Sequence, residues 1–120
     1  MQVLHTALLV TDLERARSFY EQGLGLTPAQ RSLKFPGIWY DIGSVQVHLI
    51  QADQVPTCEH PQWGRRPHLA LGIPDWQSLQ EHLLALGYEL QPSQSGRQAF
   101  FVRDPDGNVI ECSAWAGDPG

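Results

Sequence analysis

The chain has little cysteine, no long apolar run and no long basic run, and each shortage excludes a class of protein. Cys58 and Cys112 are the only cysteines in 120 residues, without the C-x-x-C spacing of a zinc knuckle and too few for a disulfide framework. No segment approaches the ~18 apolar residues of a membrane span. The net charge is −5 and the longest basic run is Arg65-Arg66, so we expect neither nucleic acid nor a membrane surface as a partner.

The remaining composition is that of an ordinary globular protein. Hydrophobic residues make up 42% of the chain and charged residues 18%, which suits one compact domain with a modest core. The start of the chain has no basic segment before an apolar run, and Asp12 interrupts the first hydrophobic stretch. We therefore expect no signal peptide, and with so few cysteines we expect a cytoplasmic protein.

An internal repeat with an offset of 63 residues organises the sequence. The segments His5 to Asp12 (HTALLVTD) and His68 to Asp75 (HLALGIPD) have identical His, Ala, Leu and Asp at equivalent positions, and Val in the first is matched by Ile in the second. Repeats of this kind indicate that one structural unit occurs twice. Each of these segments reads as a β-strand that ends at an aspartate.

The residues after each aspartate predict a helix. Asp12 and Asp75 are suited to accept hydrogen bonds from the first N–H groups of a helix. Gly23 or Gly25 in the first copy and Gly87 in the second supply the helix end, because glycine readily adopts the left-handed conformation. Apolar residues recur at helical spacing in both copies: Leu13, Ala16, Phe19 and Tyr20 in the first, and Trp76, Leu79, Leu83 and Leu86 in the second.

The later part of each copy predicts a β-hairpin. Residues 38–42 lead through Gly43-Ser44 into residues 45–50, and residues 99–103 lead through the turn DPDG into residues 108–112. The offset of 63 also carries Asp41 to Asp104 and His48 to Glu111. A weaker strand around Pro28 to Leu33 corresponds to one around Glu89 to Gln94.

The predicted order is therefore strand, helix and three strands, given twice. We expect an α+β fold in which two tandem βαβββ modules, approximately residues 1–50 and 68–114, form one domain over residues 1–120. Residues 51–67, which contain three prolines and a glycine, form the linker. The alternative is an α+β domain whose halves match by chance. It does not explain why the capping aspartate, the apolar helix positions, the glycine at the helix end and the hairpin all recur at one offset.

Four metal-binding residue types occupy equivalent positions of this repeat. His5 and His68 lie in the first strand of each copy, and His48 and Glu111 lie in the last strand. Alternation along a strand puts His5, Ala7 and Leu9 on one face and Leu4, Leu8 and Val10 under the helix; Val109, Glu111 and Ser113 likewise share a face.

If the two copies pair with these faces inward, the four side chains meet around one divalent metal. Imidazole and carboxylate suit nickel, zinc, cobalt, manganese or iron, and His5, His68 and Glu111 correspond to the two-His-one-carboxylate set of non-haem iron sites. A single histidine in a strand is usually structural, but four such residues at symmetric positions are poorly explained by packing. His60, in the linker, and His82, at the helical place of Phe19, read as structural, and Cys112 points to the face opposite Glu111.

The whole chain resembles the vicinal oxygen chelate superfamily, which contains glyoxalase I, fosfomycin-resistance enzymes, extradiol dioxygenases and bleomycin-resistance proteins. The resembling stretches are LHTALLVTDL at residues 4–13, FYEQGLGL at 19–26 and FVRDPDGNVIE at 101–111. The resemblance implies a cupped, mixed eight-stranded sheet around a metal that chelates two neighbouring oxygens of a small-molecule substrate. By position, His5, His68 and Glu111 match the family's ligands.

Position 48 separates the members of this superfamily. Glyoxalase I has a glutamate there that acts as ligand and proton shuttle, whereas this chain has His48, which is suited to either task because its pKa ordinarily lies near neutrality. The resemblance therefore favours a glyoxalase-like lyase or isomerase in which His48 and Glu111 act in catalysis. The alternatives are an iron(II) extradiol-type dioxygenase and a non-catalytic small-molecule binding or resistance protein.

Two further expectations concern partners and substrate. Edge strands of such a sheet are usually covered by a second chain, so we expect a homodimer, with modules paired within a chain or exchanged between chains. The aromatic residues Trp39, Tyr40 and Trp63 are candidates for the cavity wall. The arginines at positions 65, 66, 97 and 103 are candidates for binding an acidic substrate, although each on its own reads as a solvated surface charge.

Overall fold

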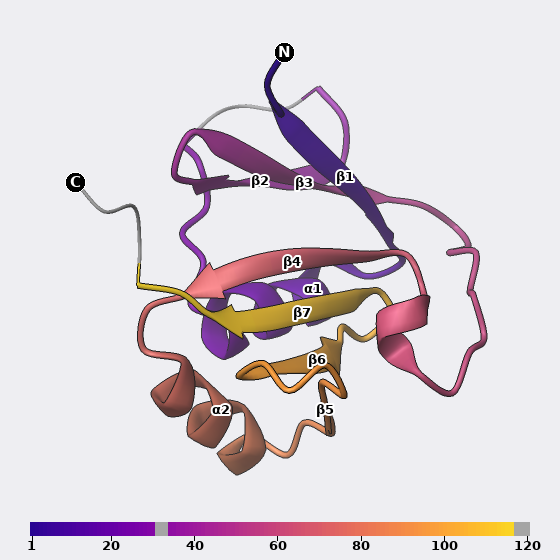
Figure 1. The fold of residues 1–120 in the computed structure, drawn as a ribbon. Coiled ribbons are helices and arrows are strands. Elements are labelled where there is room, and N and C mark those ends of the chain that lie inside the picture. Colours follow the sequence, from indigo (N-terminus) through magenta and orange to yellow (C-terminus); the bar gives the residue numbers. More distant parts are fainter. Residues whose placement is uncertain (31–33, 117–120) are drawn as a thin grey trace. The chain divides into compact units, whose positions relative to one another are not determined.

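The computed structural model describes residues 1–30 and 34–116, and it has an α+β fold (Figure 1). The chain divides into two compact units, Met1–Pro56 and Thr57–Gly120. Each unit contains one helical segment and one sheet, in the order expected for tandem βαβββ modules. No helix among the described residues is both long enough and apolar enough to cross a membrane.

The first unit is a three-stranded sheet with one helical segment. Its sheet has the order β1-β3-β2, with β1 parallel and β2 antiparallel to β3. The helix α1 continues into a wider π-helical turn, and Asp12 caps it by accepting a hydrogen bond from the N–H of Arg15 (3.0 Å). The elements are β1 (His5–Val10), α1 (Leu13–Arg17), the π-helical turn (Ser18–Gly23), β2 (Gly37–Ile42) and β3 (Val45–Gln51).

Strand alternation in the first unit separates an apolar face from a face that carries both histidines. The β3 residues Val47 and Leu49 are almost completely buried, and they lie on the same face as Val10 of β1 and Tyr40 of β2. The helical segment covers this face, because Tyr20 stacks on Tyr40 with ring centroids 6.0 Å apart and Glu21 accepts a 2.8 Å hydrogen bond from the Tyr40 hydroxyl. The opposite face contains His5 and His48.

The second unit repeats this plan with a fourth strand. Its sheet has the order β4-β7-β6-β5, with β4 parallel to β7 and the other neighbours antiparallel. The Asp75 carboxylate accepts from the N–H of Ser78 (3.4 Å) at the start of α2, and Gly87, with φ of 92°, ends it. The elements are a 3₁₀ turn (Trp63–Arg65), β4 (His68–Ile73), α2 (Trp76–Ala85), β5 (Leu90–Pro92), β6 (Ala99–Arg103) and β7 (Val109–Ala114).

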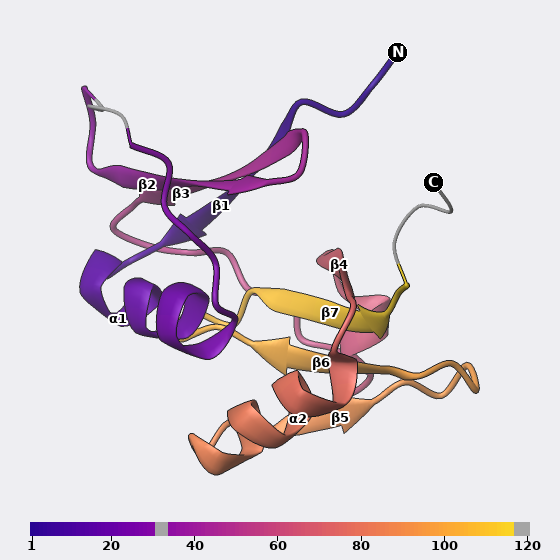
Figure 2. The same ribbon diagram turned by 90° about the vertical axis from the view of Figure 1, so that its left-hand side faces the viewer.

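Helix α2 covers the apolar face of this second sheet (Figure 2). The indole N–H of Trp76 donates to the carbonyl of Cys112 (2.9 Å), and its ring packs against Phe100 at 5.7 Å. Cys112 is fully buried on this face. The neighbouring residue Glu111 therefore points to the other face, together with His68 and Phe101.

The α+β fold with two tandem βαβββ modules predicted from the sequence is confirmed, and the described strands form two sheets of three and four strands. The expected strand around Pro28 to Leu33 is represented by a single bridge between Pro28 and Tyr40, since proline lacks the N–H that a strand ladder needs; residues 31–33 lie outside the described residues. Leu4 precedes β1 and is exposed, so the prediction that it packs under the helix is wrong. Gly25 (φ 80°), and not the buried Gly23, supplies the first helix stop.

The segment between the modules also differs from a simple linker. Trp63 is 5% exposed and belongs to a buried cluster with Phe101 and Val109. Gly64 lies against the Phe101 ring so closely that a Cβ there would be 2.7 Å from the ring's Cζ. The second half of this segment is therefore part of the core of the second unit.

Candidate functional site

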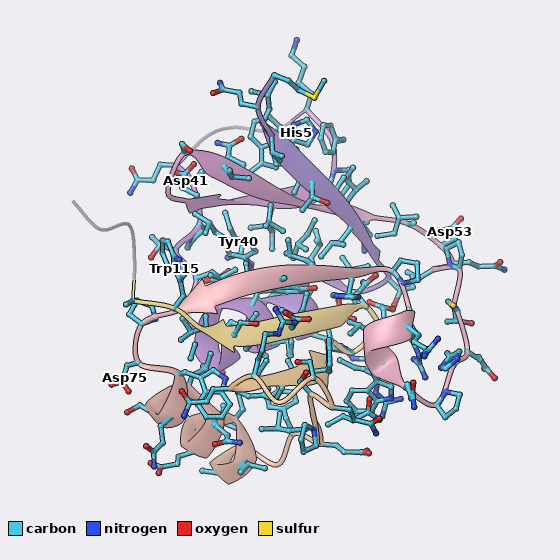
Figure 3. The ribbon with its side chains drawn as sticks, in the orientation of Figure 1. His5, Tyr40, Asp41, Asp53, Asp75 and Trp115 are labelled. Atoms are coloured by element: carbon cyan, nitrogen blue, oxygen red, sulfur yellow. The ribbon has the colours of Figure 1, made fainter. Side chains whose placement is uncertain are left out.

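The first unit holds His48 in a stack of three rings. His48 is 7% exposed at the centre of β3, and its ring is nearly parallel to the Trp39 ring (3.8 Å, 5°) and to the His5 ring (4.1 Å, 15°). Trp39 is the direct cross-strand partner of His48, whereas His5 lies two residues before Ala7, the partner of His48 on β1. Figure 3 labels His5 on the exposed edge strand β1. The stack fixes the plane of the His48 ring.

A short chain of hydrogen bonds fixes which nitrogen of His48 carries the proton. The Gln46 amide nitrogen donates to the Asp41 carboxylate (2.9 Å), and this orients the amide oxygen toward His48 Nε2, also at 2.9 Å. Because an amide oxygen only accepts, Nε2 must be the protonated nitrogen. In the neutral ring the lone pair is then on Nδ1, where it is suited to bind a metal or accept a proton.

The second unit brings His68 and Glu111 together in the equivalent place. His68 Nε2 lies 3.5 Å from Glu111 Oε1, and His68 Nδ1 lies 2.7 Å from the carbonyl oxygen of Arg66. A carbonyl oxygen cannot donate, so Nδ1 carries the proton, and the lone pair of the neutral ring is on Nε2, facing the carboxylate. Two electron-pair donors that face each other, with the histidine fixed from behind by a backbone carbonyl, form the usual surroundings of a metal ligand.

Glu111 is a buried carboxylate with two partners on one of its oxygens. It is 7% exposed; Oε2 accepts a 2.8 Å hydrogen bond from the Ser113 hydroxyl and lies 3.7 Å from Arg97 Nη2. On the opposite face of the strand, burial and then the Glu111 charge raise the pKa of the Cys112 thiol to about 12. Cys112 is therefore a buried thiol, as expected, and not a second ligand on the Glu111 face.

A cavity of about 420 Å³ opens beside His68 and Glu111, within the size range of small-molecule sites. Strand β5, the loop after it and the 3₁₀ turn supply its remaining walls. Arg65, Arg97 and Phe101 line the cavity, together with the loop serines Ser93 and Ser95. The buried ring of Phe101 provides an apolar wall and contacts the His68 ring edge to face at 5.5 Å.

The structure thus places the four predicted ligands in two pairs, one in each unit. The parallel strand pairs have the same register, because Ala7 is paired with His48 and Ala70 with Glu111. Within residues 1–30 and 34–116, no three His, Cys, Asp or Glu side chains gather closely enough to hold a metal ion. Each pair has the donor chemistry of a metal site, since three imidazoles and one carboxylate suit first-row divalent metals. The set of four remains a prediction.

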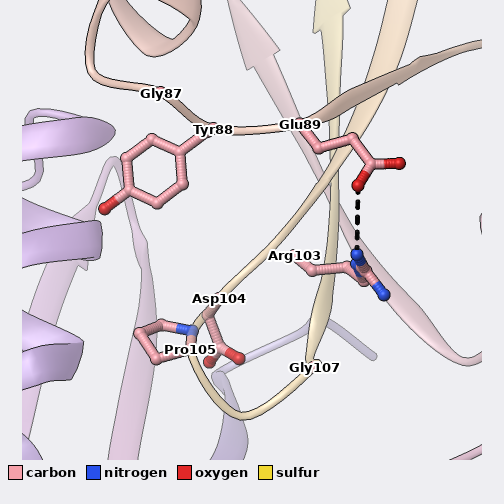
Figure 4. Close-up of a pocket in the computed structure, with 7 residues that line it drawn as sticks. All are labelled: Gly87, Tyr88, Glu89, Arg103, Asp104, Pro105 and Gly107. Carbon is pink, nitrogen blue, oxygen red and sulfur yellow. Dashed lines mark hydrogen bonds and ion pairs between the residues drawn. The ribbon is translucent and has the colours of Figure 1, made fainter.

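A second cavity of similar volume lacks this chemistry. It has a volume of about 420 Å³ and lies between the end of α2 and the β6–β7 turn (Figure 4). Arg103 there is paired with Glu89 at 3.5 Å, and the Asp104 carboxylate is occupied by hydrogen bonds within its own turn, from the N–H groups of Asp106 and Asn108. The charged side chains of Arg103 and Asp104 in this cavity therefore have structural partners.

Sequence reasoning missed the residues that orient the four candidates. Gln46 and Ser113 each lie two residues from a candidate ligand on the same strand, and therefore on the same face. This spacing is the one signal that could have identified them. The part played by the Arg66 carbonyl had no signal in the sequence, because it is a backbone group.

Comparisons with known proteins agree with this architecture. A family model described as the glyoxalase/bleomycin resistance protein/dioxygenase superfamily matches residues 2–112. A lactoylglutathione lyase of Haemophilus influenzae is 33% identical over 125 residues, covering 92% of this chain and 90% of that protein. Among solved structures, a glyoxalase family protein of Bacillus anthracis has a TM-score of 0.77 at 22% identity, with 93% of each chain covered. The trypanothione-dependent glyoxalase I of Leishmania major has a TM-score of 0.73 at 24% identity, covering 95% of this chain and 86% of that one.

Proposed function

Because the chain belongs to the glyoxalase/bleomycin resistance protein/dioxygenase superfamily, we propose that it is a metal-dependent lyase or isomerase of the glyoxalase type. Its substrate would be a small molecule with two neighbouring oxygens. The observation that carries this proposal is the His68–Glu111 pair, in which a lone pair on Nε2 faces a buried carboxylate at 3.5 Å beside a cavity of small-molecule size.

The residues that would hold the divalent metal are His5, His48, His68 and Glu111. When bound, such a metal acts as a Lewis acid for the oxygens of the substrate. The protein contributes orientation, since the Arg66 carbonyl fixes His68 and the Ser113 hydroxyl fixes one oxygen of Glu111. Nickel, zinc, cobalt, manganese and iron all suit these donors.

His48 is our candidate for moving a proton. Gln46 holds the hydrogen on Nε2, and the rings of Trp39 and His5 on either side hold the imidazole plane, so Nδ1 presents its lone pair in a defined direction. A histidine in this state can accept a proton at Nδ1 and return it without leaving its place. Glu111, the second residue to which we assign a part in catalysis, would act as a carboxylate ligand.

The chemical test follows from the relative in Haemophilus influenzae, whose name gives lactoylglutathione as the compound it acts on. The protein loaded with nickel, zinc or cobalt should form lactoylglutathione from the hemithioacetal of methylglyoxal and glutathione, without oxygen. His48→Ala should lose more turnover than bound metal, because three ligands remain.

The same preparation distinguishes the alternatives. Oxygen consumption that requires iron(II) and a catechol would replace the lyase with a dioxygenase. Tight ligand binding without turnover of any carbonyl substrate would favour a binding protein. The matched control is His82→Gln on α2, which removes an imidazole outside the predicted set and should leave the metal content unchanged.

A further inference from the structure

The wall of the cavity beside Glu111 carries two arginines whose terminal N–H groups make no hydrogen bond within the described residues. Arg65 and Arg97 both line it, and Glu111 is the only acidic residue among the described residues that do so. Two guanidinium groups against one carboxylate leave an excess of one positive charge among these three side chains, in a chain whose net charge is −5. A positive cavity in an acidic protein attracts anions selectively.

Each of these arginines is held by its Nε and leaves its terminal nitrogens for a ligand. Arg65 Nε donates to the Gln62 amide oxygen (2.8 Å), and Arg97 Nε donates to the Ser95 hydroxyl (3.1 Å). Neither guanidinium makes another hydrogen bond within the part of the chain that the structure describes. Arg97 Nη2 approaches Glu111 only to 3.7 Å, and its side chain is 64% exposed. The terminal N–H groups have the fork geometry that binds a carboxylate with two hydrogen bonds.

The loop after β5 is built to hold Arg97 in this place. The hydroxyls of Ser93 and Ser95 lie 2.8 Å apart, and Ser93 Oγ accepts from the N–H of Ser95 (3.3 Å). Ser95 Oγ in turn accepts from the backbone N–H of Arg97 (3.4 Å) as well as from its Nε. Gly96, with φ of 82°, allows the tight turn between Ser95 and Arg97. A surface arginine without a function does not need such an arrangement.

We propose that this cavity binds a small organic acid, with its carboxylate on Arg97 and Arg65 and its apolar part against Phe101. This deepens the function proposed above by naming the substrate class, and it rests on that function only for the reaction, not for binding. The buried Phe101 ring supplies the apolar contact, and His68 and Glu111 lie next to the position of the acid's neighbouring oxygen. A neutral molecule of the same shape would leave one of the two guanidinium charges without a counter-charge, because Glu111 supplies only one.

The test compares mandelate with mandelamide, a 2-hydroxy acid and its neutral analogue of equal size. Binding is followed by NMR of the ¹⁵N-labelled full chain, through the Nε–H signals of Arg65 and Arg97, after metal removal with a chelator and again with zinc. We expect mandelate to shift both signals saturably and to bind roughly ten-fold or more tightly than mandelamide, because charge-assisted hydrogen bonds are about twice as strong as neutral ones.

The variants separate a specific site from a general charge effect. Arg97→Gln should abolish the preference for the acid, and Arg97→Lys should retain part of it, because lysine keeps the charge but loses the fork. Arg103→Gln removes the same charge from the same unit, but Arg103 lines other cavities (Figure 4), so the preference should persist. Thermal unfolding of each variant checks that it is folded.

The outcomes also separate this inference from the proposed function. Equal affinities for acid and amide, no saturable shift, or equal losses in the Arg97→Gln and Arg103→Gln variants would overturn the anion site, even in a protein that binds zinc. An acid preference that persists in a chain without any metal affinity would support the anion site and reject the metal-dependent function.

Discussion

Replacing Glu111 with glutamine separates a metal ligand from a structural carboxylate. The variant keeps the shape of the side chain and removes its charge. Glu111 is 7% exposed, and its charge is compensated by Arg97 at 3.7 Å and by the Ser113 hydroxyl at 2.8 Å. In Glu111→Gln the amide oxygen can still accept from Ser113, and the new NH₂ group can donate to the His68 Nε2 lone pair.

These partners determine how far Glu111→Gln should change the free energy of unfolding and the metal affinity. The Arg97 side chain is 64% exposed, so its charge interaction with Glu111 is screened by water and contributes at most ~1 kcal/mol to stability. With the buried hydrogen bonds retained, the free energy of unfolding should change by no more than ~1 kcal/mol. A direct ligand should matter more to the metal than an outer partner does, so the affinity should fall by more than the ~100-fold upper value for outer partners.

The assay measures both quantities on one preparation. Zinc affinity is obtained by competition with a chromophoric chelator, and stability by urea unfolding of the metal-free protein. Glu59→Gln is the control, since Glu59 is an exposed carboxylate of the same unit and lines a different cavity. Unchanged zinc affinity in Glu111→Gln would refute the ligand assignment, and a loss of several kcal/mol in stability would refute our account of its partners.

Three further predictions test other parts of the molecule. Tyr40→Phe removes the hydroxyl that donates to Glu21 and should lower the free energy of unfolding by ~1–2 kcal/mol in urea titrations. Burial, and then Glu21, raise the pKa of the Tyr40 phenol; because the unfolded chain then ionises first, wild-type stability should fall above about pH 10, and less so in the variant. Gln46→Met removes the acceptor that keeps the His48 proton on Nε2, so the imidazole ¹⁵N shifts of His48 should differ from those of the wild type. Identical shifts would contradict the assigned tautomer. Light scattering at micromolar concentration should give the mass of a dimer, since both sheets have edge strands, and a monomer mass would reject it.

The repeat predicted which residues of the two units are equivalent and which share a strand face, because side-chain direction in a strand depends only on alternation. An offset of 63 residues relates His48 to Glu111, and the structure gives these residues the equivalent partners Ala7 and Ala70. The faces assigned to His5 and Glu111 followed from the same rule. Apolar stripes and aspartate caps predicted the helices for an equally local reason.

The hairpins departed from the repeat because their turns differ. Gly43-Ser44 makes a tight turn in the first unit, whereas the second has a longer turn from Asp104 to Asn108. As a result Trp39 opposes His48 but Phe101 opposes Glu111, an offset of 62 instead of 63. Asp41 therefore lies within a strand (Figure 3) and binds Gln46, while Asp104 lies in the turn and holds it together. The sequence predicted turns of different length, Gly43-Ser44 and DPDG, but periodicity alone does not fix which residues face each other across a hairpin.

The repeat makes positions 48 and 111 equivalent, but their surroundings favour different tasks. Glu111 carries a charge that Arg97 and Ser113 compensate, and such a carboxylate is suited to remain an anion and bind a cation. His48 has flat aromatic neighbours in Trp39 and His5, and its hydrogen bond to Gln46 fixes the proton on Nε2. A fixed imidazole can take up and release a proton at Nδ1 while its ring stays in place, whereas a change in the charge of Glu111 would disturb both of its partners. This difference supports Glu111 as the ligand and His48 as the group that moves the proton.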